Sequence, residues 1–187
     1  MLSVYDDLSY SFDRVENGAF HLWCQLDVNG KPPIRNYVVC ADVASGDGGD
    51  YCSNSAVIVI DMSTGEQVME FVTKVVKPTD LADKAIAIAK WFHGAFLAWE
   101  HMGPGAAFTT RVRERGYGHC FERETLDKFT RKSTRKLGFD NRGAAREALF
   151  GDLEREVRTG GIILRSKYLA EELGQYIRND KGKIQHV

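Results

Sequence analysis

A short apolar segment that ends in a carboxylate constrains this chain more than any other feature. Residues 37–41 (YVVCA) lead into Asp42, and a glycine-rich turn then reaches Asp50. An apolar run of this length indicates a buried strand, which delivers the acid to the end of that strand. Glycines after the acid allow a tight turn and the close approach of a ligand or metal. The alternative is a loop with solvated aspartates, because aspartate and glycine are common turn residues.

Length and net charge indicate one globular domain without a general attraction for polyanions. The chain has 187 residues, enough for one well-filled core, and its net charge is −1. A nucleic-acid partner must therefore be met by a local basic patch. The four cysteines form no CxxC pair, which favours reduced thiols over a zinc site or a disulfide framework. No apolar stretch approaches the length of a membrane span, so we expect no membrane partner.

The order of apolar segments predicts an α/β fold. We expect residues 1–34 to be an N-terminal tether or linker with one strand, and residues 35–187 to form the main domain. Strands joined by short polar turns, followed by alternating helices and strands, predict a mixed sheet with antiparallel hairpin strands and helices on both faces. The expected strands are 19–28, 37–42, 55–62, 66–76, 95–100, 119–121, 162–164 and 183–187, and the expected helices are 81–92, 104–115, 144–157 and one beginning at Ser166.

A second apolar run, residues 95–99, also ends in an acid, Glu100. Strand ends of open α/β sheets border the crevice where ligands bind, so Asp42 and Glu100 converge if their strands are neighbours. Two close carboxylates repel each other, and a divalent cation such as Mg²⁺ or Mn²⁺ removes that penalty. Two such ions would drive in-line hydrolysis of a phosphodiester. Two helix N-cap acids would give the same pattern.

Several motifs follow one another in a fixed order. They are Asp42 with residues 44–50 (ASGDGGD), the strand 57–61 with STGE, residues 99–105 (WEHMGPG), residues 137–139 (LGF), and residues 160–164 (GGIIL) before a helix with Glu171 and Glu172. In this order they resemble the C-terminal nuclease domain of the large terminase subunit of tailed bacteriophages. The resemblance covers about residues 19–187, and it implies an RNase H-like fold. It also implies a metal-dependent endonuclease that cuts concatemeric double-stranded DNA for packaging into a procapsid.

Within this resemblance, Asp42 matches the first metal-binding acid, Glu100 the second, and Asp50 a further acid of the first motif, with two Mg²⁺ or Mn²⁺ ions. The family's third acid follows the last strand, but here the sequence ends at Val187, and Asp180 is a poor substitute. We therefore expect a truncated domain without the third ligand, whose full activity is not assured. The sequence has no GxxxxGK[ST] loop. The implied partners are an ATPase domain, the portal of the procapsid and a small terminase subunit, in the host cytoplasm.

A basic stretch between residues 111 and 136 stands out from a nearly neutral chain. Taken alone, it is also compatible with a solvated loop and a charged helix face. With the resemblance, it predicts a surface that holds DNA beside the metals through phosphate contacts that read little sequence. The candidate DNA-binding residues are Lys128, Arg131, Lys132, Arg135 and Lys136.

Two other functions fit the same pattern. Another RNase H-like nuclease, such as a resolvase, would share the fold and the acids but prefer a different nucleic-acid substrate. A non-catalytic DNA-binding module of a packaging motor would share the basic stretch without cleaving DNA.

Overall fold

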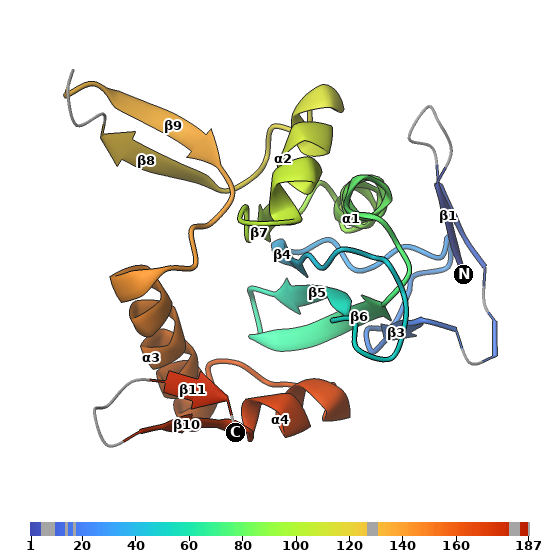
Figure 1. Ribbon diagram of the computed structural model, residues 1–187. Coiled ribbons are helices and arrows are strands. Elements are labelled where there is room, and N and C mark those ends of the chain that lie inside the picture. Colours follow the sequence, from blue (N-terminus) through green and yellow to red (C-terminus); the bar gives the residue numbers. More distant parts are fainter. Residues whose placement is uncertain (5–9, 14, 17, 127–130, 180–183, 187) are drawn as a thin grey trace.

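The computed structural model describes residues 1–4, 10–13, 15–16, 18–126, 131–179 and 184–186 (Figure 1). Its centre is a mixed sheet of five strands in the order β3-β6-β5-β4-β7. Strands β4, β5 and β6 form an antiparallel meander, whereas β7 pairs with β4 in parallel. The expected mixed sheet is therefore confirmed. The strands are β3 (Phe20–Leu22), β4 (Tyr37–Asp42), β5 (Ser55–Asp61), β6 (Glu66–Thr73) and β7 (Phe96–Trp99).

Alternation of side chains explains why the meander holds together. In β5 every second residue is buried, and Val57 and Val59 are completely covered. β-branched side chains at this period fit a pleated surface packed on one face. The last residue of β5, Asp61, is also buried, and its carboxylate accepts a hydrogen bond of 2.8 Å from the guanidinium of Arg35. The acid is thereby paired rather than left alone in the interior.

Helices α1 (Pro78–Trp91) and α2 (Gly105–Glu114) lie on one side of the sheet (Figure 1). Helix α1 begins with a proline, which suits the first helical position because its missing N–H would have no partner there. It crosses from β6 to β7 and thereby makes the parallel pairing of β7 with β4 possible. Both expected helices are confirmed to within a few residues.

Helices α3 (Gly143–Thr159) and α4 (Lys167–Leu173) lie on the other side, so helices flank both faces as expected (Figure 1). The expected cap of α4 is confirmed, because the Ser166 hydroxyl accepts a hydrogen bond from the Leu169 amide. The expected strand 162–164 is wrong. The only ladder contact there, within the described residues, is one bridge from Ile163 to Glu66.

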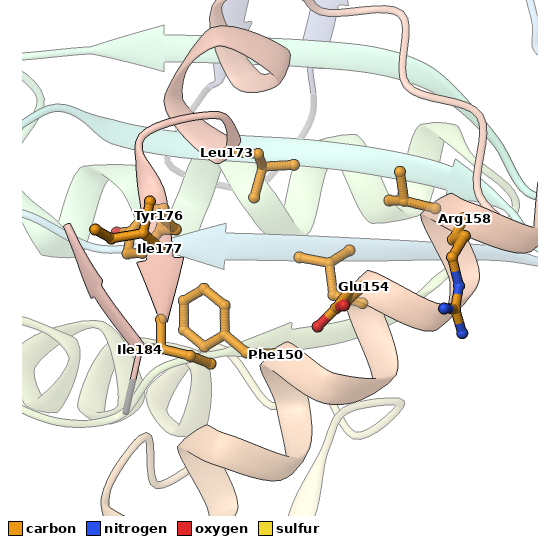
Figure 2. A pocket seen from close by; sticks show the side chains of 9 residues that line it. Phe150, Glu154, Arg158, Leu173, Tyr176, Ile177 and Ile184 are labelled. Carbon is orange, nitrogen blue, oxygen red and sulfur yellow. The ribbon is translucent and has the colours of Figure 1, made fainter. Parts of the chain in front are cut away.

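A hairpin of β10 (Tyr176–Arg178) and β11 (Ile184–His186) lies beside α3, and together with Leu173 of α4 they line an open pocket of about 360 Å³. Figure 2 shows Phe150 of α3 beside Tyr176, and their ring centroids are 5.1 Å apart. We call the described residues 143–179 and 184–186 the C-terminal region, and no residue of its helices α3 and α4 is buried. Several contacts join it to the sheet, namely the bridge from Ile163 to Glu66, an ion pair of Arg165 with Glu66, and the buried side chain of Gln67. The side-chain carbonyl oxygen of Gln67 accepts hydrogen bonds from the backbone amides of Arg165 and Ser166, each at 3.0 Å.

The first 34 residues contribute to two places in the fold. Strand β3 forms one edge of the central sheet by pairing with β6. Strands β1 (Leu2–Val4) and β2 (Tyr10–Phe12) form a separate hairpin, which buries Leu2 and stacks Phe12 on Trp91 with ring centroids 4.0 Å apart. The domain boundary at residue 34 stays a prediction. Within the described part of the chain, no helix is both long and apolar enough to traverse a membrane.

The basic stretch forms an antiparallel hairpin of β8 (Glu122–Leu126) and β9 (Ser133–Leu137), which projects from the body (Figure 1). The sequence pattern did not predict these strands. Both faces of the hairpin are in contact with solvent, so its residues do not alternate between apolar and polar. The expected strand 119–121 is also wrong, since it is reduced to a bridge between Cys120 and Leu97.

Candidate active site

Asp42 and Glu100 leave neighbouring strands side by side. In the parallel pairing of β4 and β7, Ala41 lies opposite Trp99, so the next residues along the two strands are these two acids. The side chain of Asp42 is exposed and that of Glu100 is partly buried. Desolvation by surrounding protein atoms and the charge of Glu100 raise the pKa of Asp42. The two acids thus meet at the carboxyl ends of parallel strands, where such sheets place their sites.

Glu100 is held by rigid neighbours. Helix α2 starts so close to it that a Cβ atom at Gly105 would overlap the carbonyl oxygen of Glu100, and this explains the glycine in the segment 99–105. The indole of the preceding residue, Trp99, donates a hydrogen bond of 2.8 Å to the hydroxyl of Thr109 on α2. The backbone that carries the carboxylate is therefore anchored on a strand and a helix at once.

Asn141 orients the carboxylate of Glu100. Its amide nitrogen Nδ2 donates to Oε2 of Glu100 at 3.2 Å. Its other polar atom, Oδ1, is buried and has no hydrogen-bond partner in the structure. A buried carbonyl oxygen without a partner costs free energy, and such an oxygen is also a ligand type that hard cations accept. Sequence reasoning missed Asn141, because one asparagine after the LGF motif carries no pattern of its own.

The side chain of Asn141 reaches Glu100 because residues 138–141 run beside the end of β7. The amide of Phe139 donates to the carbonyl of Trp99 at 2.7 Å, and the amide of His101 donates to the carbonyl of Phe139 at 3.0 Å. These bonds extend the sheet by one short parallel bridge at Glu100. The segment that follows the β8–β9 hairpin is thereby fixed against the candidate site.

Charged groups lie around the imidazole of His101. Burial lowers the pKa of His101, the positive charges of Arg123 and Arg142 lower it further, and Asp140 acts in the opposite direction. The imidazole is therefore biased toward its neutral form, and it does not offset the negative charge of the neighbouring carboxylates.

The glycine-rich turn after Asp42 is anchored to the connection between β6 and α1. Gly46 has φ +67°, and a side chain there would overlap the backbone of Val76. Asp47 forms an ion pair of 2.6 Å with Lys77. Asp50 is exposed, and it is not among the charges that shift the pKa of Asp42. The structure thus does not unite Asp50 with the acid pair, and its role stays a prediction.

Helix α4 adds another acid near the pair. The charge of Glu172 contributes to raising the pKa of Asp42, whereas the neighbouring Glu171 pairs with Lys167 at 3.6 Å. The sequence placed both glutamates on the helix of the last motif and assigned neither of them to the site. Among the described residues, no three His, Cys, Asp or Glu side chains gather closely enough to hold a metal ion. Asp180 lies outside the described residues.

The predicted DNA-binding residues are distributed around the β8–β9 hairpin. Arg131 precedes β9 and has a φ of 55°, and the next cation along the chain is Lys132. Arg135 and Lys136 are consecutive residues of β9, so their side chains point to opposite faces of the ribbon. Lys128 lies outside the described residues. The role of each of these cations stays a prediction.

Three solved structures show which fold this is. The chain is similar to the large terminase nuclease of thermophilic phage G20c with bound magnesium (16% identity, TM-score 0.65) and with bound cobalt (15%, 0.67). In both cases the alignment covers 92% of this chain and 79% of the other. The large terminase nuclease domain of Thermus phage P74-26 is similar over 87% of this chain and 78% of that domain (15%, 0.56).

No protein-family model and no curated protein matches the sequence. The structural likeness nevertheless confirms the expected RNase H-like fold, because it extends over most of the chain in each comparison. At these levels of identity it describes the arrangement of strands and helices and does not by itself assign a reaction.

Proposed function

We propose that this chain is a divalent-metal-dependent DNA endonuclease, the nuclease part of a phage DNA-packaging terminase. The observation that carries the proposal is the adjacency of Asp42 and Glu100 at the ends of parallel strands β4 and β7. The fold supports it, because phage large terminase nucleases share this fold, and one of them has been seen with magnesium and with cobalt.

The residues fit a hard cation such as Mg²⁺ or Mn²⁺. Such ions are commonly held by one or two carboxylates, with water and substrate phosphate as the remaining ligands. Asp42 and Glu100 would supply the carboxylates, and Asn141 would hold the orientation of Glu100 and present its unpaired oxygen. When bound, the ion supplies Lewis-acid activation of water and neutralises charge on the phosphodiester. The second ion that the resemblance implies would share these two carboxylates, and a catalytic role of Asp50 stays a prediction.

The proposed substrate is concatemeric double-stranded DNA in the host cytoplasm. The proposed partners are an ATPase domain, the small terminase subunit and the portal of the procapsid. These assignments rest on the likeness to large terminase nucleases and on the basic hairpin that stands next to the acid pair.

A non-catalytic DNA-binding module is the second candidate. It is favoured by the lack of a three-ligand cluster in the part of the chain that the structure describes. Such a module would bind duplex DNA in the presence or absence of metal and would leave it intact. A resolvase-type nuclease would instead cut branched DNA in preference to linear duplex.

The test is cleavage of supercoiled plasmid with Mn²⁺, Mg²⁺ or EDTA, combined with calorimetric titration of Mn²⁺ without DNA. Asp42→Asn and Glu100→Gln should each reduce cleavage and Mn²⁺ affinity at least about 100-fold, since changes of outer-shell residues alone cost 10–100-fold. The matched control is Asp152→Asn, an exposed acid on α3, which should change neither. Metal-dependent cutting that survives in both site variants would refute the assignment. DNA binding without cutting by the wild type would favour the binding module.

A further inference from the structure

The β8–β9 hairpin has one face that carries two cations and no carboxylate. In an antiparallel pair, directly opposed residues share a face, and the face alternates along each strand. Arg123 lies opposite Lys136, and Thr125 lies opposite Thr134. The hydroxyls of the two threonines are 2.8 Å apart, as expected for neighbours on one face. We call these four residues the cationic face. No carboxylate of the described residues forms an ion pair with its two cations.

The opposite face carries a different charge. Glu124 lies opposite Arg135 there, and Glu122 is two residues away along β8. The guanidinium of Arg135 is 3.8 Å from the carboxylate of Glu122 and 4.0 Å from that of Glu124. Two carboxylates and one guanidinium leave this acidic face with one net negative charge. Arg135 is therefore a compensated cation, although sequence alone groups it with Lys136.

The cationic face begins next to the acid pair. Nη1 of Arg123 donates hydrogen bonds to the backbone carbonyls of Leu137 and Gly138, which fixes its side chain at the base of the hairpin. Gly138 in turn lies against His101, the residue after Glu100, since a Cβ atom at Gly138 would be 2.7 Å from the Cβ atom of His101. A fixed guanidinium loses less conformational entropy when it meets a phosphate than a freely rotating side chain does. The face thus extends from the candidate site toward the tip of the ribbon.

We infer that the cationic face of the hairpin is the surface on which the DNA backbone lies, and that the acidic face points away from it. Exposed cations and hydroxyls are the groups that bind phosphate oxygens, whereas the paired glutamates of the other face repel them. Lys136 therefore contacts phosphate and Arg135 does not. The inference rests on the proposed function, and it specifies which side of the ribbon meets the substrate.

The two consecutive residues of β9 provide a matched test. Lys136→Gln and Arg135→Gln each remove one positive charge from the same strand of the same hairpin. Binding is measured by fluorescence anisotropy with a labelled 30-base-pair duplex in EDTA, over a range of salt concentrations. Lys136→Gln should weaken binding about threefold or more and reduce the salt slope by about 0.9, the value for one phosphate contact. Arg135→Gln should change affinity less than about twofold, with an unchanged slope.

Further outcomes separate this inference from the proposed function. Lys136→Arg keeps the charge and should retain wild-type affinity and slope, and a loss there would overturn the electrostatic argument. Equal losses in the two glutamine variants, or a larger loss in Arg135→Gln, would overturn the assignment of the face alone. A wild-type chain that does not bind duplex DNA would overturn both proposals. Thermal unfolding midpoints of all variants should match that of the wild type, because the substituted side chains are exposed.

Discussion

Helices α1 and α3 show the same kind of apolar spacing in sequence but have very different surroundings. Helix α1 completely buries Leu81, Ile86 and Ile88 between the sheet and its neighbours. Helix α3 is longer, 17 residues against 14, yet none of its residues is buried, and Leu149 is 47% exposed. An apolar stripe therefore predicts that a helix forms and which side it presents. It does not predict how much protein covers that side.

The difference between the helices extends to the regions that contain them. The central sheet with α1 and α2 forms one continuous core, whereas the C-terminal region contains the open pocket between α3 and the β10–β11 hairpin (Figure 2). Stability is thus concentrated around the strands that carry Asp42 and Glu100. We expect the C-terminal region to open at lower free-energy cost than the core.

The largest contrast should come from shortening one apolar side chain in each helix. Ile88→Ala removes completely buried methyl groups and should cost about 2–5 kcal/mol of unfolding free energy. Leu149→Ala on α3 should cost less than about 1 kcal/mol, because its side chain is half exposed. Urea denaturation of both variants measures the two values. Similar losses would mean that α3 is covered in solution.

A smaller effect should follow from removing one contact between the C-terminal region and the sheet, the hydrogen bonds accepted by Gln67. Gln67→Leu fills a similar volume but leaves the amides of Arg165 and Ser166 without their common acceptor, and the buried Ser166 amide accounts for most of an expected total cost of about 1–3 kcal/mol. Hydrogen exchange of residues 162–173 should accelerate, while α1 keeps its protection. Equal acceleration of exchange in both regions would show that they unfold as one unit, and it would contradict the expected difference in stability between them.

The smallest contrast concerns ion pairs. Asp83 of α1 accepts hydrogen bonds from Arg111 of α2 and from Arg115 directly after that helix, and its side chain is only 13% exposed. The substitution Asp83→Asn should cost about 1–2 kcal/mol of unfolding free energy at pH 7, because the carboxylate is ionised there and its charge-assisted hydrogen bonds are intact. Asp152→Asn on α3 should cost about 0–0.5 kcal/mol, because Asp152 and its partner Arg155 are both exposed.

The pH dependence of the Asp83 effect follows from its pKa. Burial acts to raise the pKa of Asp83, but the hydrogen bonds from Arg115 and Arg111 outweigh it, and the net shift is downward. A lowered folded-state pKa stabilises the protein above the unfolded-state value of about 3.9, and this contribution is lost as pH falls through the folded-state pKa. The cost of Asp83→Asn should therefore shrink below about pH 4. A pH-independent cost would show that the lost interaction does not depend on charge.

The local sequence pattern was sufficient to predict the strands that carry Asp42 and Glu100. The apolar run before Asp42 and the one before Glu100 predicted both strands, because strand ends follow from hydrophobicity and length alone. The helices around Ile88 and after Ser166 followed from periodicity and capping in the same way. These features depend on residues within one or two turns of one another along the chain.

Other features depended on long-range pairing. Parallel contact of β7 with β4 brings Asp42 and Glu100 together, and only the folded sheet shows that they are adjacent. Asn141 reaches Glu100 only because the segment after β9 lies along the same edge.

The sequence by itself determined that Asp42 and Glu100 stand at the ends of two strands, where the helices run and that the chain has a concentrated basic stretch. The tertiary structure alone decided which acids are neighbours and which of two adjacent cations, Arg135 or Lys136, is compensated by glutamates. The physical reason is that propensity and periodicity act over a few residues. Pairing partners are chosen by burial of the whole sheet, and local periodicity does not encode that choice.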